Sequence, residues 1–168
     1  MTEDLARRLI DRSEIHGKFV LSSGRTSNVY FDKFRFLTDP PLLDELAGMV
    51  SGMLPHGLTH VASPEGAATL LLAPVGIRAG LPMAVVRKEP KEYGTRERVE
   101  GEIGADARVG LIEDVSTTGH QTLAAAKALE AHGATIDIII LTIDRGGADA
   151  LRSAGYRVES VVSLRPEG

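Results

Sequence analysis

The sequence predicts an α/β fold in which a mainly parallel, twisted sheet carries helices on both faces. From residue 60 onward, short continuous apolar runs alternate with segments of helical periodicity. This pattern is typical of strands that are buried on both faces and connected by helices. The chain has 168 residues, of which 43% are hydrophobic and 25% are charged, as expected for a soluble globular protein. We therefore expect residues 1–168 to form a single domain.

A helix and two strands are expected ahead of this sheet. Leu5, Leu9 and Ile10 recur at helical spacing with polar residues between them, which predicts a short amphipathic helix. Residues 18–22 and 28–32 follow and are typical of two short strands joined by a turn.

The remaining elements follow in a regular order. Two prolines come directly after Asp39, and a helix can begin there because proline is tolerated in a first turn; we expect it to end at about Leu54. The expected strands cover residues 60–62, 83–88, 109–114, 135–144 and 157–164, and the expected helices cover residues 67–79, 118–132 and 148–154.

The stretch from Val109 to Gln121 carries the clearest functional pattern. An apolar strand is followed by Glu113 and Asp114, then by the small-residue turn 116–119 and a helix. The free amides and the dipole at a helix start favour an anion, so the turn is interpreted as a phosphate cradle. Carboxylates beside a phosphate should face something else, either sugar hydroxyls or a hydrated metal ion. The alternative is a strand, turn and helix with solvated acids.

The alternating pattern is lost in residues 88–104, a polar stretch interrupted by Pro90, Gly94 and Gly101. A loop of this length in a small domain is usually functional or disordered. We expect a mobile loop whose basic residues meet a polyanion; these are Arg87, Lys88, Lys91, Arg96 and Arg98. The charge of this stretch, taken alone, favours the alternative interpretation, in which it is a surface hairpin exposed to solvent.

Composition narrows the range of partners. The net charge of −4 argues against nucleic acid or an anionic membrane as the main partner. The absence of cysteine excludes disulfides and thiolate chemistry and fits a reducing compartment. The first residues are charged and no apolar run is long enough to span a bilayer, so we expect a cytoplasmic protein without a signal peptide or membrane segment.

The 109–121 stretch resembles the phosphoribosyl-diphosphate (PRPP) binding motif of the type I phosphoribosyltransferases. Residues 87–94, Arg-Lys-Glu-Pro-Lys-Glu-Tyr-Gly, resemble the Arg-Lys-x-x-Lys-x-His-Gly loop motif of the orotate phosphoribosyltransferases. Three further stretches fall in the family's order: residues 21–32, 62–66 and 144–146. The resemblance implies the type I phosphoribosyltransferase fold, with residues 1–38 as an N-terminal hood and residues 88–104 as a mobile catalytic loop.

The resemblance also implies an activity. Ribose 5-phosphate would pass from PRPP to orotate, giving orotidine 5′-monophosphate and diphosphate in pyrimidine nucleotide biosynthesis. Mg²⁺ would be the cofactor, held mainly by PRPP and water rather than by the protein. The protein would be a homodimer with shared active sites.

Roles for individual residues follow from the resemblance. The residues implied to bind PRPP are Glu113, Asp114, Val115, Ser116, Thr117, Thr118, Gly119, His120 and Gln121, the two acids taking the ribose and the turn its 5′-phosphate. Those implied to bind orotate are Thr117, Arg145, Tyr30 and Phe31. Those implied to act on the diphosphate, and so to be catalytic, are Lys91, Arg87, Lys88 and Tyr93.

The chain departs from the family pattern at a few positions. Tyr93 stands where many members have histidine, Glu113 where aspartate is more frequent, and Ser22 where some members have lysine. Residues 66–68 also differ from the family's diphosphate-side loop. Two alternatives therefore stay open: a phosphoribosyltransferase acting on another base, and a non-catalytic regulator that senses PRPP.

Overall fold

A six-stranded sheet forms the centre of the protein in a computed structural model that describes residues 2–21, 24–90 and 98–164. The strand order is β5-β4-β3-β6-β7-β8. The strands are β3 (His60–Pro64), β4 (Met83–Val86), β5 (Val99–Glu100), β6 (Arg108–Ser116), β7 (Thr135–Asp144) and β8 (Val158–Ser163). All neighbours pair in parallel except β5, which is antiparallel to β4. The mainly parallel sheet predicted from the sequence is confirmed.

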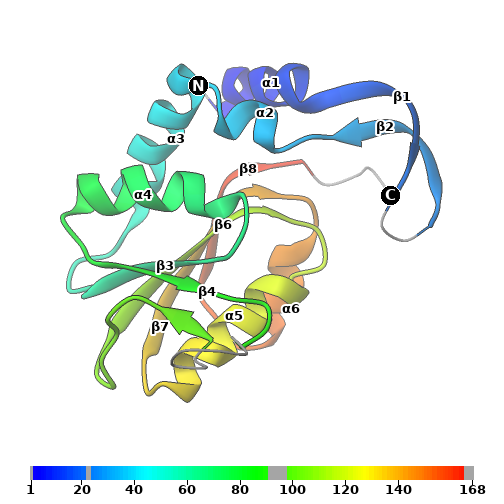
Figure 1. Ribbon diagram of the computed structural model, residues 1–168. Helices are drawn as coiled ribbons and strands as arrows, with labels where there is room; N and C mark the ends of the chain where they lie inside the picture. The colour runs from blue at the N-terminus through cyan, green and yellow to red at the C-terminus, as the bar shows by residue number, and fades with distance from the viewer. Residues whose placement is uncertain (1, 22–23, 91–97, 165–168) are drawn as a thin grey trace.

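Helices cover both faces of this sheet (Figure 1). On one face lie α1 (Thr2–Ser13), α2 (Phe34–Leu37), α3 (Pro40–Met53) and α4 (Ala68–Ala79). On the other lie α5 (His120–Ala131) and α6 (Gly147–Ser153). None of the helices in the described part of the chain is long and apolar enough to cross a membrane.

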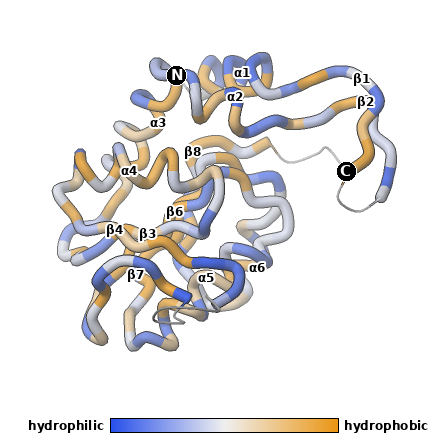
Figure 2. The backbone as a smooth tube through the Cα atoms, viewed as in Figure 1, coloured by the Kyte–Doolittle hydropathy of each residue, from blue (hydrophilic) through white to orange (hydrophobic). Residues whose placement is uncertain are grey.

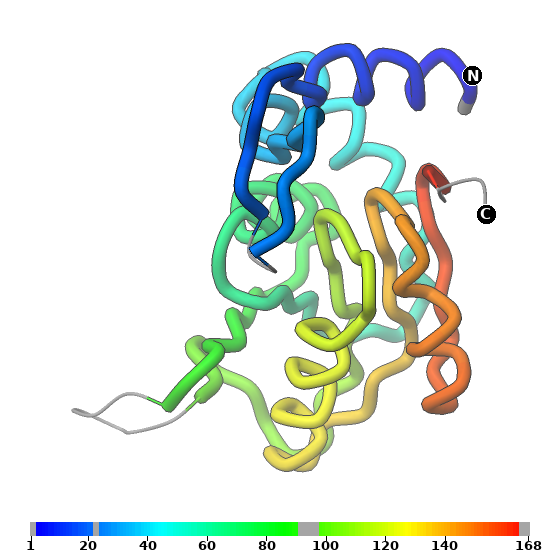
Figure 3. Tube along the Cα trace, turned by 90° about the vertical axis from the view of Figure 1, so that its right-hand side faces the viewer, coloured from blue at the N-terminus to red at the C-terminus, as the bar shows by residue number. Residues whose placement is uncertain are grey.

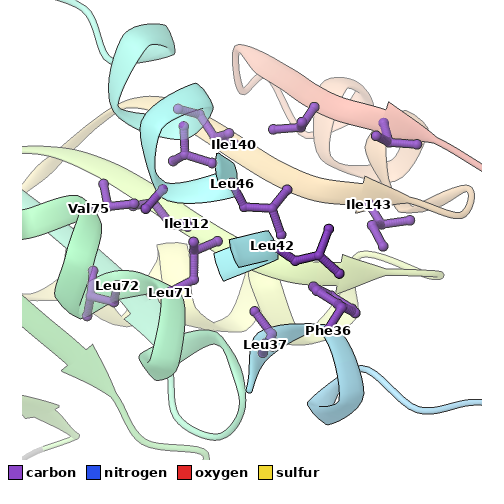
Figure 4. Close-up of a cluster of buried hydrophobic side chains, with 14 of the residues drawn as sticks. Phe36, Leu37, Leu42, Leu46, Leu71, Leu72, Val75, Ile112, Ile140 and Ile143 are labelled. Carbon is purple, nitrogen blue, oxygen red and sulfur yellow. The ribbon is translucent and has the colours of Figure 1, made fainter. Parts of the chain in front are cut away.

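Side chains of the central strands point alternately to the two faces of the sheet and form a hydrophobic core on each face. Ile138 and Ile140 of β7 pack with the helices of the first face, whereas Ile139 and Leu141 pack with those of the second. Successive side chains of a strand point to opposite faces, so a continuous apolar run serves both layers. Figure 2 shows the hydrophobic residues concentrated along these strands, and Figure 4 shows the first core closing around Leu46 and Ile112.

The N-terminal segment adds a separate antiparallel hairpin of β1 (Glu14–Val20) and β2 (Thr26–Phe31). Figures 1 and 3 show it as an arm that extends from α1 and α2 along one side of the molecule. The base of this arm is fixed because Phe36 and Leu37 of α2 are fully buried in the hydrophobic core on the first face of the sheet. We use the name hood for residues 2–21 and 24–38, the described part of this segment.

Several boundaries differ from those expected. Strand β6 does not end at the two acids but continues to Ser116, and α5 begins at His120 rather than at residue 118. The reason is Gly119, whose left-handed φ of 78° delays the helix start. The expected loop 88–104 also contains β5, whose two residues pair with the end of β4.

Candidate active site

The turn between β6 and α5 leads into a helix whose first amide, that of His120, donates to the Thr118 hydroxyl at 3.4 Å. Gly119 occupies the N-cap position of α5, and it supplies no side-chain hydrogen bond there. The amide of Leu123 donates to the Gly119 carbonyl at 2.8 Å, so the helix follows directly. The first amides of a helix have no partner within it and are available to an anion. The predicted strand, turn and helix are therefore formed, and phosphate binding at this turn stays a prediction.

Close backbone packing fixes this turn. A Cβ added to Gly119 would lie 2.8 Å from the Gly147 carbonyl oxygen, and one added to Gly147 would lie 2.1 Å from the Ser116 hydroxyl oxygen. The Arg145 amide also donates to the Ser116 carbonyl at 2.8 Å. The turn after β6 and the turn after β7 are thus packed directly on each other.

A cleft of about 700 Å³ separates this turn from the hood. Predicted site residues come from both sides: the strand and turn supply Glu113 and residues 115–121, and the hood supplies Tyr30 and Phe31. Arg145, at the end of β7, completes the lining. Segments more than eighty residues apart in the sequence therefore meet at the carboxyl ends of the strands, where ligands bind in open α/β sheets.

Glu113 lies at the bottom of the cleft and is almost fully buried, with 3% of its surface exposed. Its Oε2 accepts a hydrogen bond from the Thr122 hydroxyl at 2.9 Å, and its Oε1 accepts one from the Asp114 amide at 3.2 Å. Burial, together with the negative charge of Asp114, raises the pKa of Glu113 from 4.5 to about 8. This acid is therefore mostly protonated at neutral pH.

Asp114 faces the other side of β6 and has no exposed surface. Its carboxylate oxygens lie 2.9 and 3.1 Å from the ammonium of Lys33, and Oδ1 also accepts from the Val115 amide at 2.5 Å. Asp114 is not among the residues that line the cleft, although Lys33 is. The two predicted ribose ligands are adjacent in sequence but have different surroundings, and their contact with ribose stays a prediction.

The four residues predicted to bind the base lie in the same cleft, namely Thr117, Tyr30, Phe31 and Arg145. The guanidinium carbon of Arg145 lies 5.1 Å from the centre of the Phe31 ring. Tyr30 is 43% exposed, and its ring centre lies 5.5 Å from that of Phe19. A cation and exposed aromatic surface are thus available together, which suits a flat anionic ring.

Three of the five predicted loop cations lie at a second, smaller pocket of about 300 Å³, and the other two, Lys91 and Arg96, lie outside the described residues. Arg87, Lys88 and Arg98 line it, and it shares His120 and Gln121 with the cleft. The backbones of Arg87 and Arg98 are tied, because the Arg87 amide donates to the Arg98 carbonyl at 2.8 Å. The cations therefore stand at the edge of the cradle.

Two predicted catalytic residues, Lys91 and Tyr93, lie outside the described residues, as does Ser22. Their roles stay predictions. The segment 66–68 is described, and Gly66 and Ala67 lead into α4.

Sequence reasoning missed some residues of the cleft, and Lys33, Glu14, Ser27 and Thr122 are among them. Lys33 belongs to no recognisable motif. The only sequence signal for it is that it directly follows the expected strand 28–32 of the hood. Thr122 could have been found from its position in the first turn of the predicted helix.

The donor set bears on the expected Mg²⁺. Among the described residues, no group of three or more His, Asp or Glu side chains could hold a metal ion. Glu113 is the acid that reaches the cleft from β6, and it is buried and hydrogen-bonded to Thr122. The expectation that Mg²⁺ is held mainly by PRPP and water stays a prediction.

Comparison with known proteins places these features in context. No family model matches the chain. Curated orotate phosphoribosyltransferases from Thermococcus gammatolerans and Methanopyrus kandleri are 38% and 40% identical to it, over 94% and 96% of this chain and 88% of each relative.

Solved structures agree with these relatives. The orotate phosphoribosyltransferase of Aeropyrum pernix has a TM-score of 0.81 and 32% identity, covering 95% of this chain and 93% of that one. The Mycobacterium tuberculosis enzyme in complex with PRPP has a TM-score of 0.77 and 25% identity, with 97% and 96% coverage. An adenine phosphoribosyltransferase from Thermoanaerobacter pseudethanolicus, with a TM-score of 0.71 at 24% identity over 98% of this chain and 100% of that one, shares the fold.

Proposed function

The chain belongs to the orotate phosphoribosyltransferase family, and on that premise we propose that its cleft transfers ribose 5-phosphate from PRPP to orotate. The products are orotidine 5′-monophosphate and diphosphate. The observation that carries the proposal is the single cleft in which the turn 116–121 faces Arg145, Tyr30 and Phe31.

The 5′-phosphate of PRPP binds at the turn between β6 and α5. The backbone amides at the start of α5 and the hydroxyls of Thr117 and Thr118 are the donors available there, because Gly119 provides no cap. Placing the phosphate here puts the ribose next to Glu113 at the bottom of the cleft. A protonated Glu113 can donate a hydrogen bond to a ribose hydroxyl, and an ionised one can accept it.

Orotate binds between the hood and the end of β7. Its carboxylate pairs with Arg145, and its ring stacks on the aromatic side chains Tyr30 and Phe31. A base that lacks the carboxylate would leave the guanidinium of Arg145 without that partner, which disfavours the binding of other bases. Arg145 therefore supports orotate over the alternative of another base.

The diphosphate of PRPP extends toward Arg87 and Lys88, whose pocket adjoins the cradle through His120 and Gln121. Lys91 and Tyr93 would add a charge and a hydroxyl from the predicted loop. Cations at this position favour an enzyme over a regulator that only senses PRPP, since they neutralise a leaving group. Bound Mg²⁺ would supply further charge neutralisation at the diphosphate.

The reaction is a substitution at the C1′ carbon of the ribose. The bond from C1′ to the diphosphate oxygen breaks, and its electron pair leaves with the diphosphate. A ring nitrogen of orotate forms the new bond to C1′, and its proton is released to the diphosphate or to solvent. The sugar carries positive charge in the transition state, so the protein contributes positioning and electrostatic stabilisation instead of a covalent nucleophile.

A homodimer with shared sites and a cytoplasmic location belong to the same proposal. Large apolar side chains remain exposed on the hood and around α4, among them Val20, Phe34, Leu70, Ile77 and Met83. Exposed apolar surface of this kind supports association with a second copy. The absence of cysteine supports a reducing compartment.

An ultraviolet assay of orotate consumption with PRPP and Mg²⁺ tests the proposal. Orotate should be consumed only when PRPP is present, and uracil, adenine and hypoxanthine, assayed alongside, should react far more slowly. Turnover of a purine without turnover of orotate would contradict the assignment of the base. Binding of PRPP without turnover of any base would favour the regulator.

A further inference from the structure

The ion pair between Lys33 and Asp114 joins the hood to the strand that carries the PRPP motif. The Lys33 ammonium lies 2.9 Å from one carboxylate oxygen of Asp114 and 3.1 Å from the other. Asp114 is fully buried, whereas the Lys33 side chain is 37% exposed and lines the cleft. The pair therefore reaches from the interior of the sheet to the substrate cleft.

The backbone around Lys33 is held firmly. The Asp32 amide donates to the Ser13 carbonyl at 2.9 Å, and the Asp32 carboxylate accepts from the Phe34 amide at 3.0 Å. The following helix α2 is anchored by the buried Phe36. The backbone of Lys33 is thus fixed between two anchored segments, so that only side-chain freedom is lost when its ammonium meets Asp114.

Two acids beside a phosphate site would repel PRPP unless their charge is neutralised. The pKa of Glu113 is raised to about 8 by burial and by the charge of Asp114, so that Glu113 is mostly neutral. Asp114 is fully buried, so water does not screen its charge, and a buried carboxylate without a cation would destabilise the fold. The Lys33 ammonium is the counter-charge at this point.

We propose that Lys33 is a positioning residue of the PRPP site: it neutralises and orients the Asp114 carboxylate, which allows a polyanionic substrate to bind beside the acidic pair. This inference rests on the proposed function, because it assigns Lys33 to the PRPP half of that reaction. Lys33 acts through Asp114 and is not itself assigned to the reacting atoms.

Other charged groups lie around the same point and must be considered in any pH dependence. The titratable and charged side chains that line the cleft are Glu14 and Lys33 of the hood, Glu113 of β6, His120 of α5 and Arg145 after β7. Asp144, at the end of β7, is buried and accepts from the amides of Gly146 and Ala148. Of these groups, Lys33 is the one that forms the ion pair with Asp114.

The test compares Lys33→Met, which removes the charge at similar length, with Lys33→Arg, which keeps it. Lys33→Met should weaken PRPP binding, measured by calorimetry without any base, by at least about tenfold, since one partner of a buried charge pair is lost. The PRPP KM should rise in parallel, and the orotate KM should change much less. Lys33→Arg should restore most of the affinity.

The pH profile separates positioning from mere packing. Without the ammonium, the negative charge of the acidic pair is not compensated, so the loss of PRPP affinity in Lys33→Met should be largest at high pH and smaller at low pH, where Glu113 is protonated. Lys18→Met is the matched control, because Lys18 is an exposed lysine of the hood that lies in β1; it should leave both readouts unchanged.

Specific outcomes would overturn the inference. Folded Lys33→Met protein with wild-type PRPP affinity at high pH contradicts it, and so does a Lys33→Arg protein as impaired as Lys33→Met. If Lys33→Met does not fold, Lys33→Gln carries the same comparison, because its amide can donate to Asp114 without a charge. A wild-type protein that binds PRPP but does not consume orotate contradicts the proposed function, while the calorimetry still tests Lys33.

Discussion

At the scale of single residues, Glu113 and Asp114 show how one strand gives two adjacent acids different tasks. Neighbouring side chains of a strand face opposite sides of the sheet. Glu113 therefore meets Thr122 of α5, and Asp114 meets Lys33 of the hood. The first becomes a mostly neutral acid at the bottom of the cleft, and the second becomes a buried anion with its own cation.

The raised pKa of Glu113 predicts a pH dependence of stability. In the folded protein its pKa is about 8, whereas 4.5 is its ordinary value and the one expected after unfolding. Between these values the folded state holds a proton that the unfolded chain has released. The contribution of Glu113 to the free energy of unfolding is therefore full below the lower value and falls as pH rises to about 8, by at most about 1.4 kcal/mol per pH unit.

Glu113→Gln should remove this component, because the amide does not titrate. Urea unfolding at several pH values between 5 and 8, roughly the window in which the two states differ in bound protons, measures it. The free energy of unfolding should fall less steeply with pH in the variant than in the wild type. Equal slopes would show that Glu113 is ionised in the folded protein.

Arg145 is predicted to determine recognition of the base. Arg145→Ala should raise the orotate KM by at least about tenfold, because a charge-assisted pair worth roughly 1.5–3 kcal/mol is lost. The PRPP KM should change much less, and steady-state kinetics with each substrate varied in turn measures the difference. Arg78→Ala is the control, since Arg78 of α4 pairs with Asp44 of α3, away from the cleft. Equal increases of both KM values would contradict a role specific to orotate.

At the scale of elements, the site depends on the contact between the starts of α5 and α6. Gly119 has a φ of 78°, and an added Cβ would approach the Gly147 carbonyl oxygen to 2.8 Å. A side chain there has to push the two turns apart and strains the backbone. The turn between β6 and α5 and the end of β7 are therefore one structural unit.

Gly119→Ala should destabilise the fold by about 1–3 kcal/mol and weaken PRPP binding, because the cradle is displaced. Gly48→Ala, in α3, is the matched control: an added Cβ there has nothing within 4 Å, so it should leave stability unchanged or raise it by up to about 1 kcal/mol. Chemical denaturation and calorimetry measure the two effects. A Gly119→Ala protein with wild-type stability and PRPP affinity would show that the turn accommodates a side chain.

The elements that the sequence predicts best are those whose own apolar pattern determines them. Strand β7 has the predicted bounds, and α3 begins at Pro40 after Asp39, whose carboxylate caps it through the Leu42 amide. Strand β5 was not predicted, because two residues carry no period and only pairing with β4 defines them. For the site, the motif located Glu113 and the turn, but the contact of Lys33 with Asp114 depends on tertiary packing that no local pattern records.

At the scale of the whole molecule, the cleft is built by the hood on one side and the parallel sheet on the other. Neither side carries the site alone: the sheet provides Glu113, the turn and Arg145, and the hood provides Tyr30, Phe31 and Lys33. Figures 1 and 3 show the hairpin of the hood as an arm outside the sheet, so its position relative to the sheet determines the geometry of the cleft.

The proposed shared sites predict complementation between inactive chains. Lys91→Ala should lower kcat by at least about tenfold, and Arg145→Ala should be nearly inactive at low orotate. In a mixed dimer, a chain with intact Arg145 can receive the intact Lys91 of its partner, so part of the activity should return. Activity no greater than the sum of the separate variants, with subunit exchange verified by mass spectrometry, would place Lys91 and Arg145 of each site in one chain.

The most direct test of the account is a crystal structure with orotidine 5′-monophosphate bound. The account predicts the 5′-phosphate at the amides that begin α5, the ribose above Glu113, and the orotate carboxylate paired with Arg145 beside Phe31. A nucleotide whose phosphate lies instead in the pocket of Arg87, Lys88 and Arg98, with Arg145 not touching the base, would contradict it.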